Sequence, residues 1–166
     1  MNDSPTELLP GEIKMSNSTP TYQDAELVLK LYELRRESVM REARNWMATF
    51  NPKSIDDVMA VMGNFGSKEN AYLRQVCGYW EMVAAFIVHG TLNRELAFDT
   101  LGEMYFVYAI LQPVIGEFRT KFNAPEFFKN VQQVVEATEK GRERVAQVQQ
   151  RRAEMMSRMA AAAKHN

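Results

Sequence analysis

Apolar residues recur every three or four positions through most of this sequence, and this spacing restricts its fold more than any other feature. Alternating apolar and polar segments joined by a two-residue hairpin turn are not found. The periodicity is that of helices with one buried side, so it predicts an all-α fold. Between residues 21 and 50 the stripe consists of Val28, Tyr32, Val39, Ala43, Trp46 and Phe50.

Residues that favour helix ends divide the chain into helices. Thr21 and Asp24 resemble a capping box, and Ser67 is a good N-terminal cap for a central helix. We therefore expect a helical bundle of three long antiparallel helices, two short connecting helices and a long C-terminal helix. The long helices are expected at residues 21–50, 68–89 and 103–122, the short ones near 54–63 and 93–102, and the last from about 123 onward.

Composition suggests three parts of unequal character. Residues 1–18 contain prolines and small polar residues without periodicity, so we expect a disordered N-terminal tail. Residues 19–138 would form the helical bundle domain. Residues 139–166 carry seven basic and three acidic groups, although the whole chain has a net charge of −1. We expect this last segment to be a basic helix that projects from the bundle, packs on a second subunit or frays.

The composition also limits the chemistry that is available. The single cysteine, Cys77, cannot form an internal disulfide, and two histidines do not supply a histidine-rich metal centre. Cys77 falls on the apolar face of its helix, where a small hydrophobic role is expected. The longest apolar run has eight residues, whereas a membrane-spanning helix needs about twenty. We expect a cytoplasmic protein with no membrane span, no metal and no cofactor.

Glu81 interrupts an apolar segment and therefore needs a partner. A carboxylate in such a place must find a cation or hydrogen bonds, or become neutral. We predict an ion pair between Glu81 and Arg119, which clamps two helices together. An alternative is a small helical-bundle enzyme, whose polar pocket would be lined by Glu81, Arg119, Tyr105 or Tyr79. Because no complete catalytic set is found, the sequence favours a non-catalytic protein.

The first long helix carries a second apolar stripe, made by Leu27, Leu31 and Leu34. Two neighbours are needed to cover both stripes, and a second copy of the chain is one way to supply the second neighbour. We therefore expect a homo-oligomer, or a complex with an unidentified protein, in which these leucines are candidate partner contacts. The function that follows is a protein–protein interaction or regulatory module that self-associates.

The basic C-terminal segment supports another alternative. A nucleic acid could be bound through its phosphates by Arg151, Arg152 and Arg158. The same three residues could instead bind an acidic protein partner. A solvated helix face that carries no partner explains the same charges, and we favour it over nucleic-acid binding.

Three short segments resemble a bacterial family of small, all-helical proteins of unknown function. They are the helix with Tyr79-Trp80-Glu81, the turn Gly90-Thr91-Leu92-Asn93, and the segment from Pro113 through Ile115 to Arg119. The similarity extends over residues 27–122. It implies a helical fold and the pairing of Glu81 with Arg119, but no reaction. Some relatives have an N-terminal membrane anchor, a feature that this chain is not expected to share.

Overall fold

The structure, a computed structural model, describes residues 19–163 and confirms the all-α class. The described residues form eight α-helices and no strand. The helices are α1 (Tyr22–Arg36), α2 (Ser38–Thr49), α3 (Ile55–Met62), α4 (Lys68–Val88), α5 (Arg94–Thr100), α6 (Glu103–Lys121), α7 (Lys129–Glu136) and α8 (Glu139–Ala163). The disordered tail predicted for residues 1–18 lies outside the described residues.

Local caps explain where α4 and α5 begin. Ser67 accepts a hydrogen bond from the backbone of Asn70 at 3.1 Å, and Asn93 accepts one from Leu96 at 3.0 Å. Each bond satisfies an amide that has no partner within the helix. The predicted positions of α3, α4, α5 and α6 are confirmed to within a few residues.

The single helix predicted over residues 21–50 is wrong, because the chain breaks at Glu37. The backbone of Glu37 is extended (φ −56°, ψ 141°), and its carboxylate accepts a hydrogen bond from the amide of Met40 at 2.9 Å. Glu37 thus acts as the N-terminal cap of a new helix. The guanidinium of Arg44 in α2 reaches back to the carbonyl of Arg35 near the end of α1, at 3.4 Å.

The prediction of one continuous C-terminal helix from Asn123 is also wrong. Asn123 and Phe128 adopt left-handed backbone conformations (φ 48° and 55°), and α7 begins only after them. A second break follows α7, where the hydroxyl of Thr138 accepts from the amide of Gly141 at 3.1 Å. Thr138 therefore caps a new helix, α8, and the chain turns between α7 and α8.

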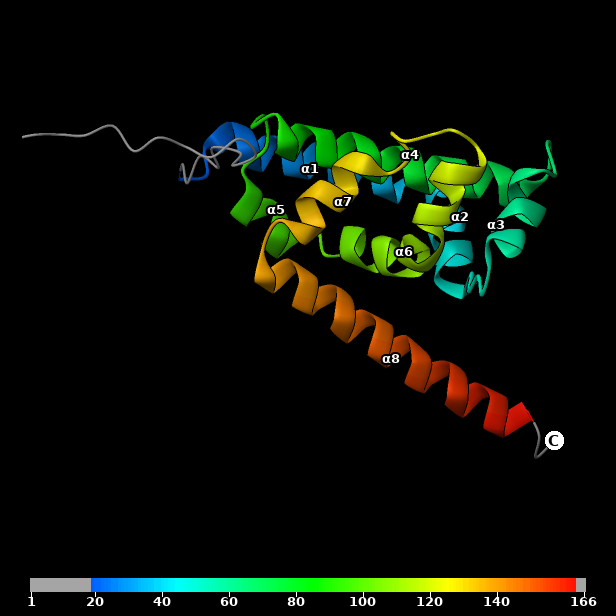
Figure 1. The fold of residues 1–166 in the computed structure, drawn as a ribbon. Helices are drawn as coiled ribbons and strands as arrows, with labels where there is room; N and C mark the ends of the chain where they lie inside the picture. Colours follow the sequence, from blue (N-terminus) through cyan, green and yellow to red (C-terminus); the bar gives the residue numbers. More distant parts are fainter. Residues whose placement is uncertain (1–18, 164–166) are drawn as a thin grey trace, which may run out of the picture.

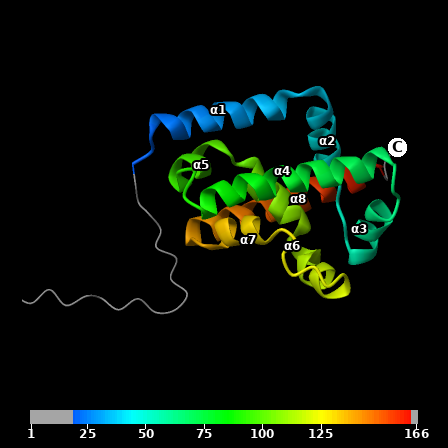
Figure 2. The same cartoon turned by 90° about the horizontal axis from the view of Figure 1, so that it is seen from above.

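The core is built around α4 and α6. Helix α4 packs on α2 and α7, and α6 packs on α7 and α8. Figure 1 shows α8 along one side of the bundle and α1 on the opposite side, next to α4. In the view from above, α5 lies next to α1 (Figure 2).

Residues 139–152 of α8 do not project or fray, contrary to the prediction for this segment. Val145 is buried, and the guanidinium of Arg144 donates to the carbonyl of Phe98 in α5 at 2.7 Å. The side-chain amide of Gln149 lies 3.4 Å from the carbonyl of Ala109. Pro113 has no amide hydrogen to offer that carbonyl, so α8 supplies the donor that α6 lacks. Only the end of α8 extends beyond these contacts.

Candidate functional site

Glu81 of α4 holds the beginning of α7. Its carboxylate accepts hydrogen bonds from the backbone amide and the side-chain amide of Asn130, both at 2.9 Å, and from the amide of Val131 at 3.1 Å. The first amides of a helix have no partner within it, and its N-terminus attracts negative charge. The half-buried carboxylate therefore finds its compensation at a helix end rather than at a cation.

Arg119 of α6 also contacts the α7 region, but it does not pair with Glu81. Its guanidinium donates to the carbonyl of Phe127 at 2.9 Å and to the side chain of Gln132 at 2.7 Å. The predicted ion pair between Glu81 and Arg119 is thus replaced by two separate clamps on the segment from Phe127 to Gln132. Glu81 and Arg119 both hold this segment, but they do not pair with each other.

The two tyrosines proposed to join Glu81 and Arg119 in an enzyme pocket point elsewhere. The hydroxyl of Tyr79 donates to the carbonyl of Leu31 at 2.8 Å, and burial raises the pKa of Tyr79 to about 12. The Tyr105 ring packs edge-on against Phe98, with centroids 5.4 Å apart. These contacts direct Tyr79 to α1 and Tyr105 to α5, away from the α7 segment that Glu81 and Arg119 hold.

The three leucines proposed as partner contacts have different surroundings. Leu31 is only 2% exposed and belongs to the core of its own chain, and Leu27 is half-buried against that core. Of the three, only Leu34 is largely exposed, at 53%. Leu31 is therefore not available for the partner contact predicted for it, whereas Leu34 is.

Sequence reasoning missed the two most exposed apolar residues of α1. Tyr22 is 75% exposed and Leu29 is 65% exposed. They are seven positions apart, so they lie on one side of the helix, two turns from each other. The seven-residue spacing in the sequence indicates that Tyr22 and Leu29 share one side of the helix. Leu27, Leu31 and Leu34 suggest an apolar stripe on a different side, so this spacing is easily overlooked.

The three C-terminal arginines do not form one surface cluster. Arg152 is buried, and its guanidinium donates to the carbonyls of Ala48 and Phe50 at 3.1 and 3.0 Å. It also lies 5.1 Å from the centroid of the Phe106 ring. Arg152 therefore caps the C-terminal end of α2, whose last carbonyls attract positive charge.

Arg151 and Arg158 remain exposed on α8, as the prediction requires. Because Arg152 is buried, only two of the three arginines predicted to form a basic cluster are exposed.

A charged cluster that sequence reasoning missed joins α1, α2 and α6. Glu103 accepts hydrogen bonds from Arg35 and from Arg44, whose Nε and Nη2 lie 2.7 and 2.6 Å from the carboxylate. The Arg35 guanidinium also lies 4.8 Å from the Tyr32 ring centroid and 5.3 Å from that of Trp80. The hydrogen bonds that Arg44 donates to Glu103 raise the pKa of Arg44. No local pattern connects residues about sixty positions apart in the chain.

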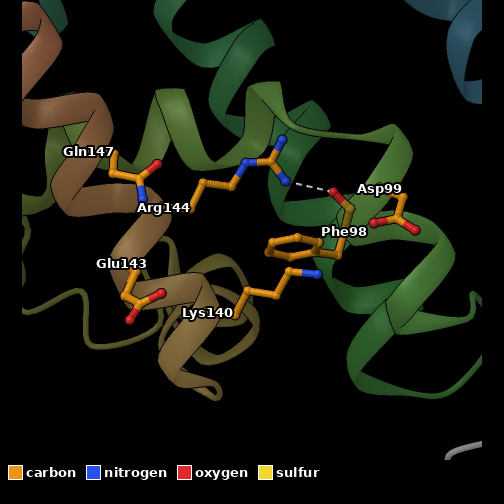
Figure 3. Close-up of a pocket in the computed structure, with 6 residues that line it drawn as sticks. All are labelled: Phe98, Asp99, Lys140, Glu143, Arg144 and Gln147. Carbon is orange, nitrogen blue, oxygen red and sulfur yellow. Dashed lines mark hydrogen bonds between the residues drawn. The ribbon is translucent and has the colours of Figure 1, made fainter.

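An open hollow of about 310 Å³ lies between α5 and α8. Figure 3 shows the Phe98 ring between two cations that approach it from opposite sides. Lys140 Nζ lies 4.1 Å from the ring centroid and the guanidinium carbon of Arg144 lies 4.7 Å from it. The acidic side chains of Asp99 and Glu143 line the same hollow, so its charges are mixed. Its cations bind the Phe98 ring and hold α8 on α5.

The described residues contain no group of three or more histidine, cysteine or acidic side chains placed to hold a metal ion. Cys77 is buried, and burial, with a smaller contribution from the charge of Glu81, raises the pKa of its thiol to about 12. Among residues 19–163, no helix is both long enough and apolar enough to cross a lipid bilayer.

Comparison with protein families gives a match. The model of a family described as a domain of unknown function, DUF4760, matches residues 20–138. The chain belongs to this family. The DUF4760 region begins at the start of α1 and ends in the turn between α7 and α8, so α8 lies outside it. Comparisons of the DUF4760 chain with curated proteins and with solved structures gave no match.

Proposed function

We propose that this protein is a non-catalytic helical module that acts through protein–protein contact and associates with copies of itself. The observation that carries the proposal is the exposure of Tyr22 and Leu29 on α1, together with Met155 and Met159 near the end of α8. Scattered exposed apolar residues are common on protein surfaces, whereas exposed apolar residues that gather in a patch mark interaction sites.

The use of the charged side chains supports the same proposal. Glu81 and Arg119 hold α7, whereas Arg35, Arg44 and Glu103 join three helices. Each of these groups serves a helix end or a helix–helix contact. This use favours an interaction protein over an enzyme, and we propose that it works without a cofactor.

The buried, reduced thiol of Cys77 is consistent with a role in the cytoplasm.

The alternative function, nucleic-acid binding, depends on three arginines, and one of them makes contacts within the fold instead. Arg152 binds the carbonyls at the end of α2, so it is not available for a phosphate. A protein that neutralises few phosphates binds nucleic acid weakly and with little dependence on salt. We therefore favour a protein partner.

Sedimentation velocity of the full chain over a range of micromolar concentrations tests the proposal. A self-associating protein should show a sedimentation coefficient that increases with concentration, or a stable oligomer. A strict monomer over the whole range would refute self-association.

A further inference from the structure

The outer side of α1 carries four exposed residues with a regular spacing. Tyr22, Glu26, Leu29 and Glu33 follow one another at intervals of four, three and four positions. Residues at such intervals form a continuous stripe along a helix. We call these four residues the acidic stripe.

The end of α8 carries a second stripe with the same intervals. Arg151, Met155, Arg158 and Ala162 are all exposed, and Met155 is 45% exposed. We call these four residues the basic stripe. In both stripes the two charged residues are seven positions apart, which is about 10.5 Å along a helix.

The two stripes are complementary when the helices run antiparallel. Intervals of four, three and four read the same in both directions, so every position of one stripe then has an opposite position in the other. Acidic residues face basic ones, and apolar residues face apolar ones. A parallel arrangement in this register would place charges against apolar side chains instead. The antiparallel pairs are Glu33 with Arg151, Leu29 with Met155, Glu26 with Arg158, and Tyr22 with Ala162.

The stripes of one chain do not meet each other. Helix α1 packs on α2 and α5, whereas α8 packs on α6 and α7. Figure 1 shows α1 and α8 on opposite sides of the bundle. Within the described residues, Glu26, Glu33, Arg151 and Arg158 form no ion pair.

We propose that the acidic stripe of one copy binds the basic stripe of a second copy as an antiparallel helix pair. The inference rests on the proposed self-association and names its surface. Each copy carries both stripes on opposite sides of the bundle, so the contact is head-to-tail and repeats from copy to copy, which forms a ring or an open chain of copies. The apolar pairs supply contact area, and the charged pairs set the register and the direction.

Charge reversal tests the inference, with sedimentation velocity as the readout. The variant E26R/E33R has two basic stripes, and the variant R151E/R158E has two acidic stripes. Each variant alone should associate at least about tenfold more weakly than the wild type, because attraction becomes repulsion at both positions. An equimolar mixture of the two variants should regain association, since each basic stripe then finds an acidic one. The chain with all four substitutions should regain it as well.

A matched control reverses two exposed charges elsewhere. K68E/R74E on α4 changes the net charge by the same amount as R151E/R158E and should leave association unchanged. The inference is overturned if either stripe variant associates as the wild type does, or if the mixture does not associate. A wild-type chain that is monomeric would instead refute the proposed function itself, so the two failures are distinguishable.

Discussion

The carboxylate of Glu81 accepts hydrogen bonds from both the backbone amide and the side-chain amide of Asn130, each at 2.9 Å. The two residues are 49 positions apart, and the contact places an anion at the first turn of α7. Helix α7 has only eight residues, and helices of this length are not stable alone in water. Its position therefore depends on contacts such as this one.

Replacing Glu81 with Gln should destabilise the fold. The variant keeps one acceptor oxygen but loses the charge and one of the accepting positions, which leaves an amide of α7 without a partner. We expect a decrease of about 1–3 kcal/mol in the free energy of unfolding. Urea denaturation measures it. E117Q removes an exposed carboxylate of α6 and should change the same quantity by less than about 0.5 kcal/mol. Equal effects of the two substitutions would contradict the clamp.

Arg151 and Arg152 are sequence neighbours with opposite roles, and they provide a second test. R152A should lower the free energy of unfolding by about 1–3 kcal/mol, because it leaves the carbonyls of Ala48 and Phe50 without their donor. R151A removes an exposed side chain and should change it by less than about 0.5 kcal/mol. Thermal and urea denaturation of both variants provide the comparison. If R151A were the more damaging substitution, the placement of α8 would be wrong.

The parts of the fold that could be predicted are those with signals close together in the chain. Ser67 and Asn93 bind amides three residues away, so their helices could be placed from the sequence. The break at Glu37 could not be predicted in this way, because glutamate also occurs throughout helix interiors. The break before α8 was concealed similarly, since Val134, Val135 and Val145 continue a helical spacing across it.

The candidate site shows the same limit. A carboxylate in an apolar segment indicates that Glu81 needs compensation, and the sequence reveals this need. It does not reveal whether a cation or a helix end supplies it, because that depends on where α7 begins. For Arg152 the signal was misleading, since a buried arginine that caps α2 and an exposed one on a basic helix look alike in the sequence.

Gly141 should not tolerate a side chain, although it lies within α8. A Cβ atom there would lie 2.2 Å from the carbonyl oxygen of Val135, a backbone atom that cannot move aside easily. We expect G141A to lower the free energy of unfolding by about 1–3 kcal/mol through this clash. G116A is the matched control, because nothing lies within 4 Å of a Cβ at Gly116 in α6. It should raise stability by about 0.5–1 kcal/mol, as expected for an open helical position. Similar changes in the free energy of unfolding of both variants would contradict the close approach of Gly141 to the carbonyl of Val135.

The thiol of Cys77 should be unreactive in the folded protein. It is buried, and its pKa of about 12 leaves very little thiolate at neutral pH. A thiol reagent added to the native chain should react at a rate limited by opening of the fold. In guanidinium chloride one thiol per chain should react rapidly. Native-state reaction as fast as that of a free thiol would show that α4 is not packed as described.

Asp24 gives the fold a dependence on pH. Its carboxylate accepts hydrogen bonds from the hydroxyl and the amide of Thr21 and from the amide of Asn93. These hydrogen bonds lower the pKa of Asp24 below its ordinary value of 3.8. Because the pKa is lower in the folded chain than in the unfolded chain, the ionised form stabilises the fold at neutral pH. This contribution is lost as the pH falls below about 5 and through the lowered pKa.

The D24N variant isolates that contribution. It should be less stable than the wild type at pH 7, and the difference in free energy of unfolding should shrink as the pH falls toward 3, where the wild-type carboxyl group gains its proton. Urea denaturation at a series of pH values measures the difference. D99N alters an exposed carboxylate for which no such hydrogen bonds are seen among the described residues, so its small difference from the wild type should not follow this course. A constant gap between D24N and the wild type from pH 7 to 3 would mean that the charge of Asp24 does not link α1 to the start of α5.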